Sequence, residues 1–210
     1  MYVLWGRGRT AEFNLAQTPA DTMGSAPHTD IESQPPVTPP ADASHSRFVQ
    51  RIRRRYAAEL PLLPPGLPRR DTITALVATL QAQGRAIVSA LRVARQLVLE
   101  RLAVLDIEQG AAMEDITLAM TELAEATLEL ALAQAVADQA VRHGLPRTES
   151  GAPIEFWVVG MGKLGARELN VSSDIDLVYV YEEDGHTDGP QPITAHEFFA
   201  QVARGLSTLI

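Results

Sequence analysis

The sequence contains no cysteine and no long run of apolar residues. Without cysteine the protein has no disulfides, no thiolate metal site and no cysteine nucleophile. No stretch approaches the roughly 18 consecutive apolar residues of a membrane span. The first ten residues, MYVLWGRGRT, lack the apolar segment of a secretory signal. We therefore expect a soluble, cytoplasmic protein that does not associate with membranes.

Aromatic residues make up only 5% of the chain, and basic residues are outnumbered by acidic ones, which gives a formal net charge of −8. A chain of this charge is not expected to bind DNA. Hydrophobic residues nevertheless account for 46% of its 210 residues. That is enough for the core of one ordinary domain, or of one domain and part of another.

Residues 1–45 are polar, contain six prolines and show no sustained hydrophobic period. Such a segment buries too little apolar surface to offset the entropy of ordering it. We expect a disordered extension over 1–45, within which Met23 is an alternative start of the protein.

A helical region is predicted over residues 46–145. Five arginines between 47 and 55 alternate with Phe48, Ile52 and Tyr56 at helical spacing. This pattern favours a short amphipathic helix with a solvated basic face over a phosphate-binding arm. The prolines from Pro61 onward are expected to end it.

Two further helical stretches follow. Asp71 is predicted to cap a stretch that continues to Leu105, with Gly84 as a weak point in its middle. A second helix is predicted from Met113 to His143 and ends at Gly144. We expect these helices to form a bundle or scaffold without chemistry of its own.

The apolar stripe expected on the second helix contains Ile116, Met120, Leu123, Leu130, Ala137 and Val141. Charged residues of this helix, Glu122, Glu125 and Glu129, fall off that stripe. Met113 and Met120 are predicted to be core residues. His143 is predicted to be a cation at the helix end.

From residue 150 the hydrophobic period changes. Residues 154–159, IEFWVV, and 174–181, DIDLVYVY, are predicted to be strands, separated by a glycine-rich turn and a brief helical piece. A polar loop leads to a final helix that Thr194 is expected to cap.

The glycine turn, GMGKLG, fits the dinucleotide-binding pattern G-x-G-x-x-G, with acidic residues about 20 positions further on. Two features disfavour an NAD(P)-binding domain. Only residues 166–173 separate the turn from the next strand, which is short for a crossover helix. Asp174 and Asp176 would also lie at the end of that strand remote from the cofactor, without partners.

A metal-dependent site uses those carboxylates instead. Alternate residues of a strand point to the same side, so Asp174 and Asp176 are expected to project together. Two adjacent carboxylates repel unless a cation lies between them, and Mg²⁺ prefers oxygen ligands of this kind. Backbone N–H groups of the glycine turn, with Lys163, suit phosphate oxygens.

The combined string GMGKLGARELNVSSDIDLVYVY, residues 160–181, is more specific than either half. A glycine loop, a short helix and S-S-D-I-D-L on a strand are typical of the DNA-polymerase-β-like nucleotidyltransferase superfamily. More narrowly, the string closely resembles the glutamine synthetase adenylyltransferase/adenylyl-removing enzymes. RFVQRIRRRYAAELPLLPPG upstream is compatible with that family. The resemblance covers residues 47–210, and its specific part is 156–181.

The resemblance implies a function. Members of that family carry two nucleotidyltransferase domains: the first removes AMP from a tyrosine of glutamine synthetase with phosphate and releases ADP, and the second attaches AMP from ATP. The motif follows the helical region and begins about 160 residues from the start of the chain, and its part ELNVSSDIDL, residues 168–177, resembles the adenylyl-removing domain. Glutamine synthetase and the P-II signal protein are the implied partners, with adenine nucleotide and phosphate as substrates or products and glutamine as a further regulatory input.

The resemblance also implies roles for individual residues. Asp174 and Asp176 would be the catalytic residues that hold Mg²⁺, or Mn²⁺. The phosphate pocket would be shaped by Gly162, Lys163, Gly165 and Ser173.

Two departures from the family pattern stand out. Ala166 occupies a position where the family often has a second glycine. The superfamily uses a third carboxylate on a later strand, whereas the one acidic residue after Asp188 is Glu197, in a predicted helix. We therefore expect an N-terminal fragment with an incomplete site, inactive on its own.

The expected fold class is α+β: a disordered extension over 1–45, a bundle-like helical region over 46–145, and the start of a nucleotidyltransferase-fold sheet over 150–210. Two alternative functions remain: an NAD(P)-binding domain, and a non-catalytic helical module.

Overall fold

The computed structural model describes residues 2–3 and 42–210. Its helices and 3₁₀ turns are η1 (Ala43–His45), α1 (Arg47–Arg55), η2 (Leu60–Leu62), α2 (Arg70–Ala82), α3 (Ile87–Gln109), α4 (Met113–His143), α5 (Gly162–Gly165) and α6 (Ala195–Leu209). Its strands are β1 (Tyr2–Val3), β2 (Pro146–Arg147), β3 (Phe156–Gly160), β4 (Leu177–Tyr181) and β5 (His186–Thr187). The α+β class expected from the sequence is confirmed.

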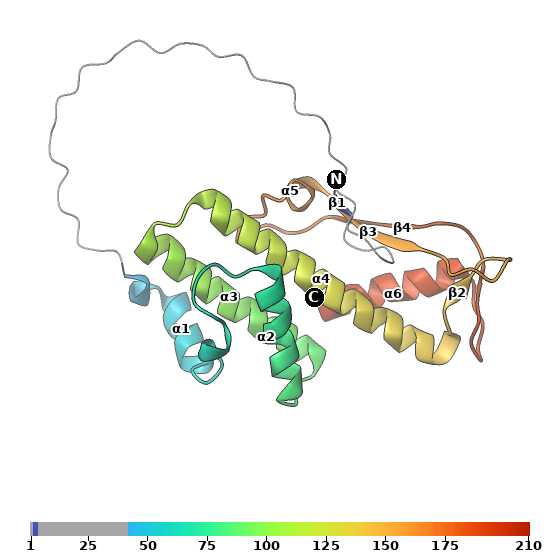
Figure 1. Ribbon diagram of the computed structural model, residues 1–210, viewed down its shortest axis with the longest axis horizontal. Helices are drawn as coiled ribbons and strands as arrows, with labels where there is room; N and C mark the ends of the chain where they lie inside the picture. The colour runs from blue at the N-terminus through green and yellow to red at the C-terminus, as the bar shows by residue number, and fades with distance from the viewer. Residues whose placement is uncertain (1, 4–41) are drawn as a thin grey trace, which may run out of the picture.

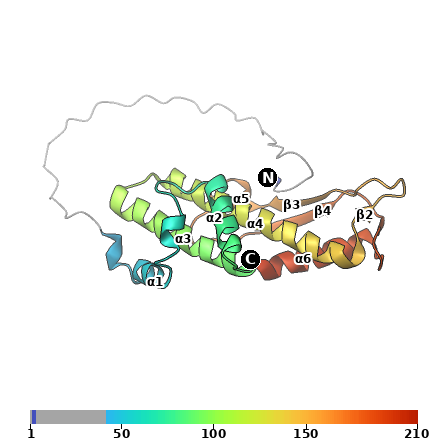
Figure 2. The ribbon, with the colours of Figure 1, turned by 60° about the horizontal axis from the view of Figure 1, so that its bottom comes forward.

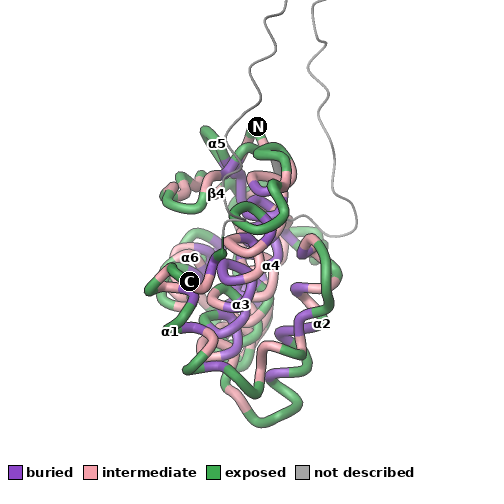
Figure 3. Tube along the Cα trace, turned by 90° about the vertical axis from the view of Figure 1, so that its left-hand side faces the viewer, coloured by how far each residue is buried: buried purple, intermediate pink, exposed green. Residues whose placement is uncertain are grey.

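The long helix α4 runs through the molecule and joins its two halves (Figure 1). Helices α1, α2 and α3 gather at one end of α4, while the β3–β4 hairpin and α6 lie along the rest of it. Buried residues of both halves belong to one continuous hydrophobic core, and the buried faces of the helices turn toward each other when the molecule is viewed end-on (Figure 3). The helical region and the sheet are therefore packed as one body.

The first helix forms as the arginine-rich pattern predicts. The side chain of Ser46 accepts the Val49 N–H and caps α1, and Val49 and Ile52 are its buried residues. The chain leaves the helix at Tyr56, before the prolines.

The stretch from residue 71 to 105 was expected to be helical throughout, and that prediction is wrong. The chain breaks into α2 and α3 around Gly84, whose φ of +91° is a left-handed conformation that favours glycine. Asp71 lies in the first turn of α2, and the N-cap position belongs to Arg69. The side chain of Thr72 bonds the N–H and the carbonyl of Arg69, which satisfies the start of the helix without Asp71 as cap.

Helix α4 has the predicted bounds but not the predicted stripe. Ile116, Met120 and Leu123 are buried, whereas Val141 is 84% exposed. Met113, predicted to be a core residue, is 65% exposed in the first turn. The partners of α4 change along its length, from α2 and α3 to α6. Its buried face therefore does not follow one straight stripe.

His143, in the last turn of α4, is buried, and its Nδ1 lies 2.6 Å from the Gln191 carbonyl oxygen. Gly144 ends the helix with a positive φ, as predicted. Its backbone approaches Gly189 so closely that a Cβ there would lie 2.3 Å from the Gly189 nitrogen. His143 therefore ties the helix end to the loop before α6.

The main sheet has the order β1-β3-β4, and both pairings are antiparallel. A second, two-stranded sheet pairs β2 with β5. Disorder was expected over 1–45, and most of that segment, residues 1 and 4–41, lies outside the described residues. Tyr2 and Val3 pair with Gly160 and Val159, and Ala43 is fully buried, so these parts of the segment are ordered.

Helix α6 packs along α4 beneath the hairpin (Figure 2). The Thr194 side chain accepts the Glu197 N–H, and the Glu197 side chain accepts the Thr194 N–H, so the predicted cap is a complete capping box. Phe199 of α6 stacks on Phe156 of β3 at 4.6 Å between ring centroids. This contact fixes the sheet on the helical layer. Among the described residues, no helix is long and apolar enough to cross a membrane.

Candidate functional site

The glycine-rich turn leaves the end of β3. Met161 precedes α5, and Gly162 opens that helix with a φ of +53°. A Cβ on Gly162 would meet nothing within 4 Å, so the backbone conformation and not the available space favours glycine there. Lys163 is exposed, Gly165 is half-buried, and the Gly165 N–H donates to the Met161 carbonyl at 3.1 Å. The turn therefore exposes its first glycine and its lysine.

Asp174 and Asp176 were predicted to lie on a strand, but β4 begins only at Leu177. The ladder stops there because Leu177 pairs with Gly160, after which β3 gives way to the turn and offers no further partner. The extended alternation continues upstream of β4: Asp174 and Asp176 are exposed, and Ile175 between them is half-buried. Both aspartates are thus exposed, as expected for alternate residues of an extended segment.

The glycine turn and the carboxylate segment are directly joined. The Met161 N–H donates to the Asp176 carbonyl oxygen at 2.9 Å. A cavity of about 400 Å³ lies against this segment; it is lined by Ser173, Asp174 and Ile175 and, from α3 and α4, by Arg95 and Thr127 among others. The structure therefore brings both halves of the sequence motif together.

Ser173, expected to shape a phosphate pocket, forms a local turn. Its hydroxyl donates to Asn170 Oδ1 at 2.5 Å, and its N–H donates to the Asn170 carbonyl at 3.2 Å. The hydroxyl stabilises the turn that leads into the carboxylate segment.

Two exposed carboxylates two residues apart supply oxygen ligands of the kind that a divalent cation prefers. Within residues 2–3 and 42–210, no group of three or more His, Cys, Asp or Glu side chains is arranged to hold a metal ion. Glu197, the acidic residue after Asp188, is engaged in the cap of α6. A cation site at Asp174 and Asp176 therefore stays a prediction from the sequence, without a third ligand of this kind beside them in the described part of the chain.

The dinucleotide interpretation is not supported by the fold. A nucleotide-binding βαβ unit requires parallel strands joined by a crossover helix. Here β3 and β4 are antiparallel, and α5 between them has four residues.

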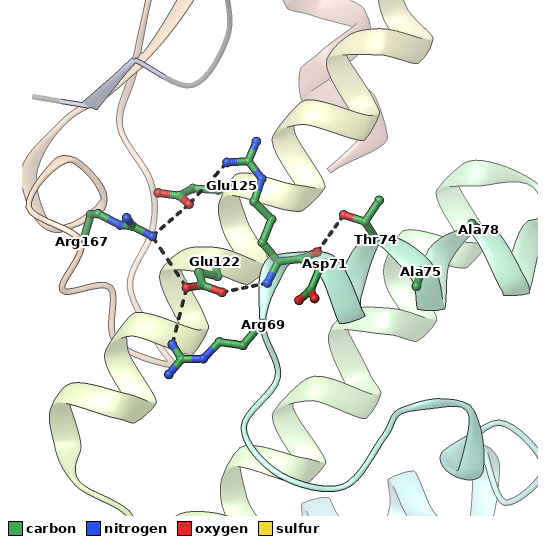
Figure 4. Close-up of a pocket in the computed structure, with 9 residues that line it drawn as sticks. Arg69, Asp71, Thr74, Ala75, Ala78, Glu122, Glu125 and Arg167 are labelled. Carbon is green, nitrogen blue, oxygen red and sulfur yellow. Dashed lines mark hydrogen bonds and ion pairs between the residues drawn. The ribbon is translucent and has the colours of Figure 1, made fainter. Parts of the chain in front are cut away.

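A cluster of charged side chains lies between the start of α2, the middle of α4 and the segment after the glycine turn (Figure 4). Its acidic members on α4 are Glu122 and Glu125. Arg167 Nη2 lies 3.4 Å from Glu125 Oε2 and 3.8 Å from Glu122 Oε1. Arg70 lies on the other side, with its Nη1 4.0 Å from Glu125 Oε2 and its N–H donating to Glu122 at 2.8 Å.

Glu125 is the most enclosed member of this cluster, since its side chain is 1% exposed. Burial raises the pKa of the Glu125 carboxyl, and the charges of Arg167 and Arg70 lower it in part. A buried carboxylate needs such partners to remain ionised. The cluster therefore depends on both arginines.

The sequence interpretation missed this cluster, because it placed Glu122, Glu125 and Glu129 off the apolar stripe and assigned the helices no role in the site. Their spacing of three and four residues does place them on one helical face. That spacing could have indicated a shared set of basic partners, but not that Arg167, 42 residues further on, would be one of them.

Comparison with known proteins adds an independent observation. Residues 46–210 match the family described as glutamate-ammonia ligase adenylyltransferase. Three curated relatives are each named bifunctional glutamine synthetase adenylyltransferase/adenylyl-removing enzyme. The one from Ralstonia nicotianae is 36% identical over 91% of this chain and 21% of its own length. Those from Burkholderia mallei and Bordetella pertussis are 47% and 46% identical, over 58% and 57% of this chain and 13% of their own lengths.

The chain thus spans about a fifth or less of the length of these relatives. The family match covers the helical region, the glycine turn and the carboxylate segment together. The chain belongs to the glutamate-ammonia ligase adenylyltransferase family.

Proposed function

We propose that this chain is part of the adenylyl-removing unit of a bifunctional glutamine synthetase adenylyltransferase, and so serves the control of nitrogen assimilation in the cytoplasm. In the proposed reaction an oxygen of inorganic phosphate attacks the phosphorus of the AMP group on a glutamine synthetase tyrosine. The bond to the tyrosine oxygen breaks, the tyrosine hydroxyl is restored, and ADP leaves.

One observation carries the proposal. Asp174 and Asp176 are both exposed in one segment, and that segment is bonded to the glycine turn through the Met161 N–H, which donates to the Asp176 carbonyl oxygen at 2.9 Å. Phosphoryl transfer requires that the negative charge on the phosphate oxygens is balanced. It also requires a loop whose backbone can approach those oxygens closely. The two halves of the motif meet that requirement only when they adjoin.

The residues have distinct proposed roles. Asp174 and Asp176 would hold a divalent cation, Mg²⁺ or Mn²⁺, which when bound would neutralise charge on the phosphoryl oxygens. The exposed Lys163 would bind phosphate as a point charge, and Gly162 and Gly165 would allow the backbone to approach it. Ser173 would act through the turn that it forms with Asn170.

The family resemblance extends the proposal to regulation. Glutamine synthetase would be the protein substrate, and the P-II signal protein and glutamine would set the direction of the modification. Helices α1–α4 would form the helical scaffold that packs against the glycine turn and the carboxylate segment.

An activity experiment can separate the two halves of the proposed enzyme. The chain is joined to the remainder of the Ralstonia nicotianae relative in place of its matching part. ADP release from adenylylated glutamine synthetase and phosphate is measured, alongside attachment of AMP from ATP. Asp176→Ala should abolish ADP release and leave attachment unchanged. Loss of attachment with retained ADP release would contradict the assignment to the adenylyl-removing unit.

A binding experiment on the 210-residue chain tests the cation site directly. Mn²⁺ should bind measurably, and Asp174→Asn should abolish that binding while the helices stay folded, as circular dichroism reports. Unchanged Mn²⁺ affinity in this variant would remove the metal site. Absence of both Mn²⁺ and nucleotide binding in the parent chain would favour a non-catalytic helical module.

A further inference from the structure

A strained residue lies between the glycine turn and the two carboxylates. Arg167 has a φ of +61° and is the one non-glycine residue with positive φ within the described ranges. It follows α5 in a Schellman motif, where its N–H donates to the Leu164 carbonyl at 3.1 Å and the Glu168 N–H donates to the Lys163 carbonyl at 2.9 Å. Glycine usually occupies this position, because a Cβ in the left-handed conformation is unfavourable.

The contacts of the Arg167 side chain explain why an arginine occupies this position instead of glycine. It reaches α4 and lies 3.4 Å from the buried Glu125 and 3.8 Å from Glu122 (Figure 4). Two residues further along, the buried Leu169 N–H donates to Thr121 Oγ1 of the same helix at 3.1 Å. Side chains from one stretch of α4 thus hold the segment at two successive points.

The distance in sequence from these anchors to the carboxylates is short. Leu169 is buried, and the bonds between Asn170 and Ser173 close the turn that follows it. Asp174 comes next. Little freedom is left between the anchor on α4 and the first carboxylate, so a displacement of Arg167 would be passed on to Asp174 and Asp176.

We propose that Arg167, through its ion pair with the buried Glu125, is a positioning residue for the carboxylate segment. It makes no contact with the cation. Its role is to fix the backbone after the glycine turn, so that Asp174 and Asp176 present their carboxylates in one arrangement. The inference rests on the cation site of the proposed function.

A matched pair of variants distinguishes positioning from general stabilisation. Glu125→Gln removes the charge that holds Arg167. Glu100→Gln removes a comparable charge in the helical region, because Glu100 of α3 has a side chain only 7% exposed and lies 2.7 Å from Arg53 Nε. Glu125→Gln weakens the pairs with Arg167 and Arg70, and Glu100→Gln weakens the pair with Arg53, but only the first cluster adjoins the carboxylate segment.

The readout is the Mn²⁺ dissociation constant of the 210-residue chain, followed through the electron paramagnetic resonance signal of free Mn²⁺, together with thermal unfolding. Glu125→Gln should weaken Mn²⁺ binding about 10-fold to 100-fold, the range for partners that orient metal ligands. Glu100→Gln should change the Mn²⁺ dissociation constant less than about twofold, although it should lower the thermal stability about as much as Glu125→Gln does.

Arg167→Gly provides a second, independent variant, because glycine suits the positive φ and relieves the backbone while the ion pair is lost. It should weaken Mn²⁺ binding as Glu125→Gln does, and Arg167→Lys should restore part of the affinity. If Asp174→Asn abolishes Mn²⁺ binding but Glu125→Gln and Arg167→Gly bind as tightly as Glu100→Gln, the positioning role is refuted and the cation site stands. If Asp174→Asn also leaves the affinity unchanged, both are refuted.

Discussion

Replacement of Thr121 by valine should loosen the segment that leads to the carboxylates. Thr121 lies on α4 and is fully buried. Its hydroxyl accepts the Leu169 N–H at 3.1 Å and donates to the Thr117 carbonyl at 2.9 Å. Valine has nearly the same shape, so the packing is kept, and the main loss is the acceptor for a buried N–H.

The size of the effect follows from that orphaned donor. A buried N–H left without a partner costs about 1–3 kcal/mol. In a chain of this size each kcal/mol lowers Tm by about 2–4 °C. A loss near the middle of the range, about 2 kcal/mol, corresponds to a Tm decrease of about 4–8 °C. Because Leu169 precedes the carboxylate segment, its amide should also exchange faster with solvent.

Thermal unfolding and amide hydrogen exchange measure the two consequences. Thr79→Val is the matched control, since Thr79 is exposed on α2 and its hydroxyl bonds only the Ala75 carbonyl of its own helix. Its effect should stay within about 0.5 kcal/mol. A Thr121→Val variant as stable as Thr79→Val, with unchanged exchange at Leu169, would refute the view that α4 holds this segment.

Three further predictions concern the frame of the site. Phe198→Ala should cost about 3–5 kcal/mol in urea unfolding, because this side chain is 1% exposed between α6 and α4; Val141→Ala, at an 84% exposed position, should be neutral, and equal effects would contradict the assigned core. Thr194→Ala should cost about 1 kcal/mol by loss of the α6 cap, whereas Thr194→Ser should not, and equal losses would exclude capping as the cause. Because the pKa of Glu125 is raised above its ordinary value of 4.5, the stability that this carboxyl contributes is fully present below that value and is lost as pH rises through the folded pKa. The stability of the wild type relative to Glu125→Gln should therefore fall as the pH rises above 4.5, and a rising difference would contradict the burial argument.

The sequence predicted those elements whose signals are local. The bounds of α4 follow from a helix pattern that ends at Gly144, and the cap of α6 follows from Thr194 and the Glu197 three residues later. Both signals act within one turn of helix, so no knowledge of the rest of the fold is needed.

Features that depend on partners were predicted only in part: both main strands form, but with other starting residues. The residue pattern predicts a strand that starts at Asp174. A strand also needs a neighbouring strand, and β3 ends at Gly160 opposite Leu177, so β4 starts only there. Val141 fits a helical stripe, but with the described residues around it 84% of it is exposed.

The candidate site shows the same division. The glycine turn and Asp176 lie within one short motif, and the structure joins them by a hydrogen bond from the Met161 N–H to the Asp176 carbonyl oxygen. The link between Glu125 and Arg167 crosses 42 residues and depends on how the chain returns past α4. No local pattern contains that information.

Helix α4 also restricts how this part of the chain can change in length. Its 31 residues form a rod of about 46 Å, and each residue turns it by about 100°. One side of its N-terminal half carries Thr121 and Glu125 toward the carboxylate segment, while Ala135 further along meets Gly205 of α6, where a Cβ would lie 3.3 Å from the Ala135 Cβ. One residue inserted between Glu125 and Ala135 would rotate these faces out of phase, whereas the exposed Gly110 turn before the helix can absorb added residues. Insertions and deletions among relatives should therefore avoid the middle of this helix and collect at its ends.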